Sequence, residues 1–301
     1  MKAILYYLVR KLFSPGYRNK LKIAKYNLQK KLTPYYRWRN GSFTAAELEM
    51  ELKSKLPQQY QSLMIHSAHS SLLPMYSGSL SELLQVFLNL GDGQRTLVMP
   101  AFFFGERKYN FDIAGYFRDK PYFDVEKTPS QTGMLTEMFR KLPGVKTSNH
   151  PTHRLCALGP LAEELLKGHE NCRTACGQGS PFEKMAAANT LVLGVGVRYY
   201  QSMTQTHATE EILFEQGKYP TKFDSVELPV TITSKNGVID HKLTLLDKSP
   251  YQRRVHPLLQ KVMGKDLLQW KFHGVPMYLA NTHRVTEKLN EAALAGKSAY
   301  F

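Results

Sequence analysis

Short apolar segments that alternate with amphipathic segments constrain the fold of this chain more than any other feature. Segments 62–66, 96–99 and 190–197 have the length and composition of strands, and the last is strongly apolar throughout. Helical segments separate or follow them, at 80–90, 128–142, 158–166 and 206–214. Strands separated by helices form sheets that are covered on both faces. The sequence therefore predicts an α/β fold with a mixed, largely parallel central sheet flanked by helices.

The ends of the chain show different patterns. Residues 226–246 alternate like two antiparallel strands, and Asn236-Gly237 is typical of a tight hairpin turn. Near the other end, Thr44 can cap a helix, and Glu47 three residues later completes a capping box. We therefore predict two units: a basic helical arm over residues 1–43, and one main domain over residues 44–301 that includes the hairpin.

The N-terminal arm is strongly basic. The first 46 residues contain eleven of the 40 Lys and Arg residues and no acidic residue. Bulky apolar residues lie among these cations, and Ser14-Pro15-Gly16 divides the arm into two short helical pieces. One interpretation is an amphipathic surface over residues 1–40 that contacts anionic lipid. The other is a pair of helices packed on the main domain with a solvated basic face. Nucleic acid is disfavoured, because no recognition motif accompanies the charge.

The three cysteines, Cys156, Cys172 and Cys176, indicate the redox compartment. Such an odd, sparse set argues against a disulfide framework and fits a reducing cytoplasm. No apolar stretch reaches the ~18–20 residues of a membrane span, and the apolar segment 3–9 lacks a signal-peptide cleavage site. We therefore expect a cytoplasmic protein, peripheral at the inner face of the membrane if the arm binds lipid. A zinc site at His169, Cys172 and Cys176 is disfavoured without a Cys-x-x-Cys pair, and we expect no metal.

One candidate for catalysis is the pair His207 and Glu210, which follows the most apolar strand. If a helix begins at Thr206, the two side chains share a face one turn apart. A carboxylate beside an imidazole fixes its tautomer and raises its basicity, which suits a general base. Taken alone, the same spacing also describes a solvated surface pair.

Three further groups could bind a ligand. His150 and His153 flank a proline in a loop, where they are either functional groups or ordinary surface residues. Ser180 and Glu183 can cap a helix preceded by glycines, and the polar loop 66–71 follows a strand. A helix N-terminus presents N–H groups to a phosphate, but a well-capped helix needs no ligand to explain it.

The order of these motifs along the chain resembles the aminoglycoside 3-N-acetyltransferase family. The resemblance covers about residues 63–214, and it includes a His-Pro turn at 150–151, a Gly-Ser-Pro-Phe run at 179–182 and a Thr-His-Ala-Thr-Glu run at 206–210. The His-Pro turn closes a matched run over 143–151, and the remaining matches are segments 97–103, 123–125, 128–140, 157–162 and 191–195. Each motif alone is weak, whereas eight in the family's order are specific.

The resemblance implies the family's α/β fold, acetyl-CoA as donor and a primary amine on a sugar as acceptor. It implies that His207 is the general base and that Glu210 orients it. It also implies a set of coenzyme neighbours: His66, Ser67, Ser70, Ser71, His150, Ser180, Phe182 and Thr206. None of the cysteines has the adjacent activating group of an acyl-enzyme nucleophile.

Two departures from the family pattern bear on the acceptor. Arg198 stands where relatives often have an acidic residue, and Arg154 where a small residue is common. We expect both, with Tyr199, to contact the acceptor, and arginines there favour a phosphate-bearing amino sugar such as a precursor of a surface polysaccharide. The alternatives are an aminoglycoside, for which the family is named, and a non-catalytic protein of the same fold that docks on a membrane.

Overall fold

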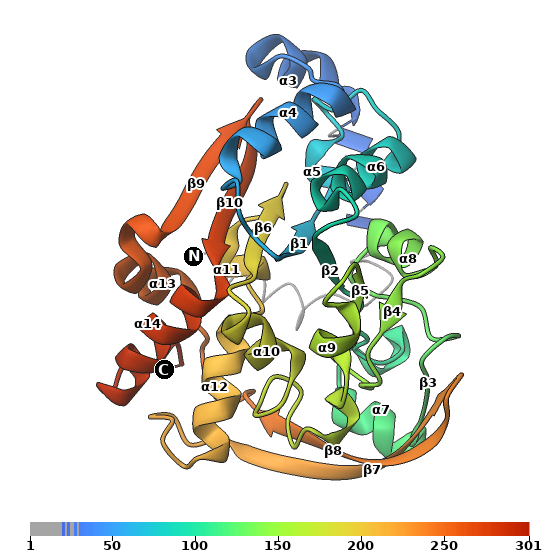
Figure 1. Ribbon diagram of the computed structural model, residues 1–301, viewed down its shortest axis with the longest axis vertical. Helices are drawn as coiled ribbons and strands as arrows, with labels where there is room; N and C mark the ends of the chain where they lie inside the picture. Colours follow the sequence, from blue (N-terminus) through green and yellow to red (C-terminus); the bar gives the residue numbers. More distant parts are fainter. Residues whose placement is uncertain (1–19, 22, 25–26, 29, 301) are drawn as a thin grey trace.

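The computed structural model describes residues 20–21, 23–24, 27–28 and 30–300, and it confirms the mixed α/β fold (Figure 1). A seven-stranded sheet has the strand order β4-β5-β2-β1-β6-β10-β9. Its strands are β1 (Ser62–Ser67), β2 (Thr96–Pro100), β4 (Lys146–Thr147), β5 (Leu155–Leu158), β6 (Leu191–Val195), β9 (Leu267–Phe272) and β10 (Val275–Asn281). The parallel part of the sheet is its centre, where β1 pairs with β2 and β6. The outer strands run antiparallel to their neighbours.

Helices cover both faces of this sheet, which is why the central strands are apolar along their whole length. One face packs against α9 (Ala162–Leu166), α10 (Pro181–Ala187), α12 (Thr206–Glu215), α13 (Val255–Met263) and α14 (Thr282–Leu294). The other packs against α4 (Ala45–Lys55), α6 (Leu80–Gly91) and α8 (Met134–Arg140). The remaining described helices are α3 (Thr33–Asn40), α5 (His69–Leu72), α7 (Ile113–Asp119), α11 (Tyr199–Ser202), and the 3₁₀ turns Arg107–Tyr109, His169–Asn171 and Gly264–Asp266.

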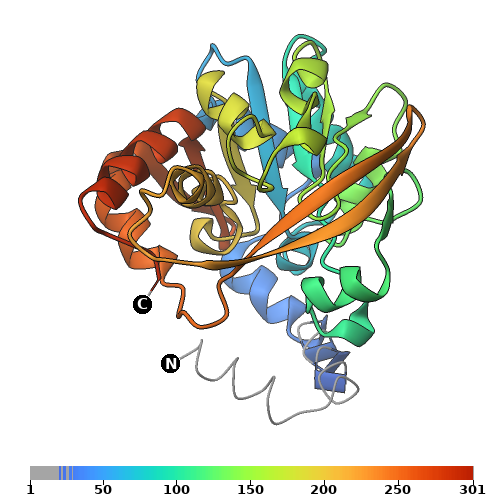
Figure 2. The same cartoon turned by 90° about the horizontal axis from the view of Figure 1, so that it is seen from below.

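The predicted hairpin is confirmed as a long twisted ribbon across one end of the molecule (Figure 2). Its strands are β7 (Asp224–Ser234) and β8 (Gly237–Asp247), and β3 (Tyr122–Asp124) pairs in parallel with β7. The ribbon has its own apolar cluster, which includes Phe117, Phe123 and Ile232. Because β8 ends at Asp247, the ribbon delivers the segment that follows it to the side of α12.

Two of the predicted helices are shorter than expected. Side-chain and backbone hydrogen bonds hold the start of one in a loop, and a glycine precedes the other. The helix expected over 128–142 begins only at Met134, because Gln131 is held in a loop by bonds to the carbonyls of Phe102 and Gly105. The helix expected over 158–166 begins at Ala162, because Gly159 has a φ of +130° and the preceding residues form strand β5.

The helix cap predicted at Thr44 is confirmed. Thr44 and Glu47 form the expected capping box, with Thr44 N donating to Glu47 Oε2 over 2.7 Å. The predicted break at Ser14-Pro15-Gly16 lies outside the described residues, and the division at residue 43 stays a prediction. Within the part of the chain that the structure describes, no helix is both long and apolar enough to cross a membrane.

Replacing Gly194 by alanine should destabilise the fold. A Cβ atom at position 194 would lie 1.9 Å from Cε1 of Tyr278, whose side chain is 1% exposed at the centre of the sheet. We expect overpacking to lower the free energy of unfolding by about 1–3 kcal/mol, measured by urea denaturation. A second change, Tyr278→Leu, should recover part of the loss in the double variant. Equal stability of Gly194→Ala and the parent chain would contradict this packing.

Candidate active site

Helix α12 carries the candidate catalytic pair. β6 ends at Val195, Gly196 turns the chain with a φ of +74°, and α12 begins at Thr206 after the short helix α11. His207 and Glu210 share one face of α12, as predicted, and Nδ1 of the imidazole lies 2.7 Å from Oε2 of the carboxylate. An ionised carboxylate only accepts, so Nδ1 carries the proton and the lone pair of His207 lies on Nε2.

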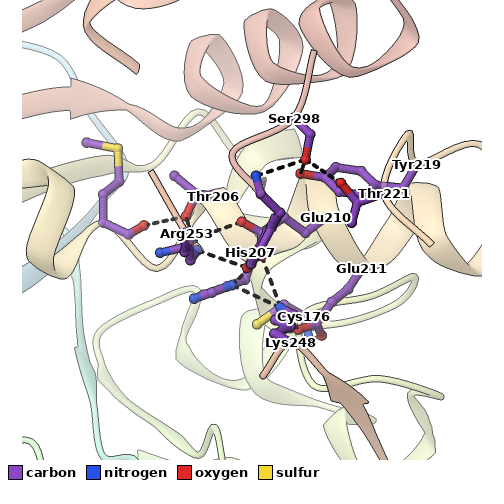
Figure 3. A network of polar contacts seen from close by, with 12 residues as sticks. Cys176, Thr206, His207, Glu210, Glu211, Tyr219, Thr221, Lys248, Arg253 and Ser298 are labelled. Carbon is purple, nitrogen blue, oxygen red and sulfur yellow. Dashed lines mark hydrogen bonds and ion pairs between the residues drawn. The ribbon is translucent and has the colours of Figure 1, made fainter. Parts of the chain in front are cut away.

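Glu210 is the centre of a buried polar network (Figure 3). Its side chain is 4% exposed. Besides His207, it accepts hydrogen bonds from Lys248 Nζ at 3.0 Å, Arg253 Nη2 at 2.8 Å and the hydroxyl of Tyr300 at 2.7 Å. Burial opposes ionisation of this carboxyl, but the charges of Lys248 and Arg253 and the contact with His207 outweigh it and hold its pKa well below its usual range.

The same surroundings keep His207 neutral. Burial is the largest effect, and the cations Arg253 and Lys248 act in the same direction, against the attraction of Glu210; together they lower the pKa of His207 to about 4. The imidazole is therefore uncharged at pH 7, in the form that can accept a proton. The arrangement can take a proton at Nε2 and stabilise the resulting cation through Glu210.

Two further carboxylates fasten α12 to the loop before α10. Glu211 accepts the backbone N–H of Cys176 over 2.7 Å. Glu215 accepts the backbone N–H groups of Thr174 and Gln178 over 3.1 and 2.9 Å. Because charge-assisted bonds of this kind are strong, they fix the helix that positions His207.

A cluster of histidines lies beside His207. The ring of His153 is centred 6.3 Å from that of His207, and His153 packs on Phe102 at 4.8 Å. His150 lies behind it, 1% exposed and stacked on His169 at 4.5 Å. Nδ1 of His150 accepts the backbone N–H groups of Thr152 and His153, both over 3.2 Å, so its ring shapes the turn that presents His153. The coenzyme contact predicted for His150 stays a prediction, and the histidine of this turn that lies beside His207 is His153.

The predicted coenzyme loop after β1 reaches the start of the site. His66 is 6% exposed, and its Nε2 lies 3.4 Å from Oγ1 of Thr204, just before α12. Ser67 ends β1, Ser70 is exposed and Ser71 is partly exposed, so their hydroxyl groups border the loop surface. The following N–H of Ala68 donates to Val195 O over 3.0 Å, which ties this loop to the end of β6.

The other predicted coenzyme neighbours make contacts that stabilise the fold. Ser180 is fully buried, and its hydroxyl caps α10 by accepting from Glu183 N. Phe182 is fully buried in the apolar core. Thr206 is 3% exposed, donates to Met203 O over 3.0 Å and accepts from Arg253 over 2.8 Å. The structure therefore brings Thr206 to the network around Glu210 and leaves Ser180 and Phe182 in supporting positions.

The predicted acceptor contact of Arg154 is wrong. Arg154 is 0% exposed, and its guanidinium donates to the carbonyls of Ala101, Val125 and Thr128 over 3.2, 2.5 and 2.8 Å. It also lies over the ring of Phe123 at 5.3 Å. Arg154 thus joins loops around the ribbon and is closed to solvent.

Arg198 and Tyr199 lie near a surface hollow of 370 Å³, lined by Tyr200, Arg253, Arg254, Val255, His256 and Pro257. Arg198 is exposed and donates to the hydroxyl of Tyr200 over 2.7 Å. Tyr199 is 2% exposed and contacts His256 through its hydroxyl, so it supports the hollow from behind. Only Arg198 of the three predicted acceptor residues is open to solvent.

Lys248, Arg253 and Tyr300 are site residues that could not be predicted from the sequence. Lys248 and Arg253 lie in a basic stretch after the hairpin, and their charge was a signal, but nothing in the sequence pairs them with Glu210.

Within the described residues, no group of three His, Cys, Asp or Glu side chains could hold a metal ion. Both ring nitrogens of His169 are bonded, to Ser148 Oγ at 2.9 Å and Ala175 O at 2.8 Å.

The α/β fold of this chain has known counterparts. The family model described as aminoglycoside 3-N-acetyltransferase matches residues 64–287. Aminoglycoside N(3)-acetyltransferase III from Salmonella sp is 29% identical over 160 residues, which cover 50% of this chain and 54% of that protein. The chain thus matches only about half the length of this curated relative.

Solved structures share the fold over most of their length. The crystal structure of aminoglycoside acetyltransferase AAC(3)-Xa has a TM-score of 0.71 at 19% identity and covers 88% of this chain and 99% of its own. AAC-IIIb, solved as a binary complex with CoASH, has a TM-score of 0.66 at 20% identity and covers 83% of this chain and 95% of its own. The chain belongs to the aminoglycoside 3-N-acetyltransferase family.

Replacing Arg154 by methionine should destabilise the protein, because the carbonyls of Ala101, Val125 and Thr128 would each lose a hydrogen bond from the buried guanidinium. We expect the free energy of unfolding to fall by about 3 kcal/mol, measured by chemical denaturation. Arg198→Met is the matched control, since its side chain is exposed and its loss should leave stability nearly unchanged. A stable Arg154→Met variant would show that the buried bonds contribute little.

The ionisation of His207 should depend on Lys248. In the parent chain, NMR titration of the imidazole should give an apparent pKa of about 4. Lys248→Met removes a nearby positive charge that disfavours the imidazolium, so the apparent pKa should rise. The control is Lys242→Met, at an exposed position on β8. An unchanged or lower His207 pKa in Lys248→Met would contradict the electrostatics of the site.

Proposed function

We propose that this chain catalyses transfer of an acetyl group from acetyl-CoA to a primary amine of an amino sugar. The observation that carries the proposal is the contact between a neutral His207 and a buried, ionised Glu210 in a chain of this family. In this role His207 is the general base, and Glu210 orients it.

His207 would accept a proton at Nε2 from the attacking amine. Glu210 remains ionised beside Lys248 and Arg253, so it can stabilise the imidazolium that forms. Bound acetyl-CoA would supply a thioester carbonyl to be attacked and a sulfur leaving group. A C–N bond forms, the C–S bond breaks, and the proton held by His207 is available to the departing sulfur. A base in this position contributes ~10²–10⁴ in rate.

Direct transfer is favoured over an acyl-enzyme. Burial raises the pKa of Cys156 and of Cys172 to about 11, and the pKa of Cys176 lies well above its ordinary value. A thiol that stays protonated and buried is a poor nucleophile. The amine and the thioester would therefore react in one ternary site, where alignment lowers the barrier.

An aminoglycoside is the favoured acceptor. The curated relative is named for aminoglycoside N(3)-acetylation, and a related aminoglycoside acetyltransferase has been solved in complex with a gentamicin. Two arginines, Arg154 and Arg198, favoured a phosphate-bearing precursor of a surface polysaccharide as the acceptor, but Arg154 is buried. Arg198 still favours that second candidate, since it is exposed at the rim of the hollow beside the site. The presence of both His207 and Glu210 disfavours a non-catalytic role. A binding titration with coenzyme A would distinguish such a protein from an acetyltransferase.

Changing His207 or Glu210 should slow acetyl transfer without abolishing coenzyme binding. With gentamicin as acceptor and thiol release as the readout, His207→Ala should lose about 10²–10⁴ in kcat/KM. Glu210→Gln should lose activity as well, because the imidazolium loses its stabilising charge. Coenzyme A affinity, measured by calorimetry, should remain close to that of the parent chain.

Glu163→Gln on α9 is the control for loss of a carboxylate elsewhere in the domain, since its side chain is 73% exposed and contacts Lys146. Running the assay with an amino-sugar nucleotide in place of gentamicin decides between the two acceptors. Turnover of His207→Ala at the parental rate would exclude the proposed base.

A further inference from the structure

Exposed apolar side chains gather on the described part of the N-terminal arm. Six of the thirteen large apolar residues that the structure shows as exposed lie between residues 20 and 39. They are Leu21 (42%), Ile23 (53%), Leu28 (57%), Leu32 (37%), Tyr35 (47%) and Trp38 (81%). Exposing so many large apolar side chains to water is unfavourable, so a surface of this kind indicates a binding partner.

Cations without acidic partners surround these side chains. Lys20, Lys30, Lys31, Arg37 and Arg39 are exposed, and none of them takes part in the ion pairs found among the described residues. No acidic residue precedes Glu47 in the sequence. The arm therefore carries a positive charge that no acidic residue of the arm neutralises.

Helix α3 is fixed to the main domain by one side only. Tyr36 packs on the apolar core, and Arg37 Nε donates to Pro74 O over 2.9 Å. After α3, Nδ1 of His273 contacts Asn40 O at 2.7 Å, and Phe43 is 1% exposed in the core. Tyr35 and Trp38 remain exposed to solvent, with ring centroids 6.1 Å apart.

We propose that the described residues of the arm, 20–21, 23–24, 27–28 and 30–39, form a docking surface for an anionic phospholipid bilayer. Lys and Arg are attracted to acidic headgroups, while Trp and Tyr favour the boundary between headgroups and acyl chains. Leu and Ile side chains gain free energy only where they reach an apolar phase. A nucleic acid would use the cations and leave these aliphatic side chains in water, so the bilayer fits the whole surface.

Docking through this surface would leave the candidate active site open. Figure 1 shows α3 at one end of the long axis of the molecule and α12 toward the other. The hydrogen bonds of His207 and Glu210 go to residues of the main domain, and none goes to a described residue of the arm. Lipid binding and acetyl transfer to a soluble acceptor are thus separable, and failure of either proposal leaves the other standing.

The test uses the full chain and sedimentation with lipid vesicles. Binding to phosphatidylglycerol vesicles should be strong, should weaken with added salt and should be nearly absent with phosphatidylcholine alone. Lys30→Gln with Lys31→Gln should weaken binding by about fivefold for each cation removed. Lys261→Gln with Lys265→Gln removes the same charge from exposed positions of α13 and the turn after it, and should have little effect.

Tryptophan fluorescence tests which side chain enters the bilayer. The chain has two tryptophans, so Trp270→Phe leaves Trp38 as the only one. Its emission should shift to the blue on addition of phosphatidylglycerol vesicles, and Trp38→Ala should weaken binding more than Leu294→Ala at another exposed apolar position. Acetyl transfer by the arm variants should match the parent chain, which shows that they fold.

The proposal is overturned if the chain ignores phosphatidylglycerol, if the arm variants bind as the parent does, or if Trp38 emission stays unchanged. Tighter binding to a DNA or RNA duplex than to the vesicles, lost in the same arm variants, would assign the surface to nucleic acid instead.

Discussion

The buried carboxylate of Glu210 is the constraint on which the rest of the site depends. An isolated carboxylate in this position would take up a proton rather than stay ionised. Four partners prevent this: His207 one turn away, Lys248 after the ribbon, Arg253 before α13 and Tyr300 near the end of the chain. Segments far apart in sequence thus converge on one carboxylate, and the cations that keep it ionised also keep His207 neutral.

This arrangement has a consequence for acceptor recognition. Glu210, Glu211 and Glu215 of α12 are all satisfied by internal partners, either cations or backbone N–H groups. They hold the helix and its loop in place, and they are not free to attract a polycationic acceptor. In the proposed function, recognition of the acceptor would therefore depend on the surface around the pair, where His153, the loop after β1 and the hollow beside Arg253 lie.

Local chemistry explains what could be predicted from the sequence. The central strands, the hairpin at Asn236-Gly237 and the capping box at Thr44 follow from periodicity and turn chemistry, and the contact of His207 with Glu210 follows from helical spacing. The C-terminal strands β9 and β10 were not predicted, although they form a local hairpin whose turn has positive φ at His273 and Gly274, and only β10 also pairs with the distant strand β6. Arg154 could not be placed from the sequence, because an arginine in a sequence looks like a surface residue and only the fold shows three carbonyls around it.

A crystal structure of the chain with coenzyme A would show whether His207 faces a bound thioester. We expect the coenzyme sulfur to lie beside Nε2 of His207, with Nδ1 still bonded to Glu210 and with Lys248 and Arg253 still in contact with the carboxylate. A sulfur atom bound away from His207, or a His207 ring turned from Glu210 in the complex, would contradict this expectation.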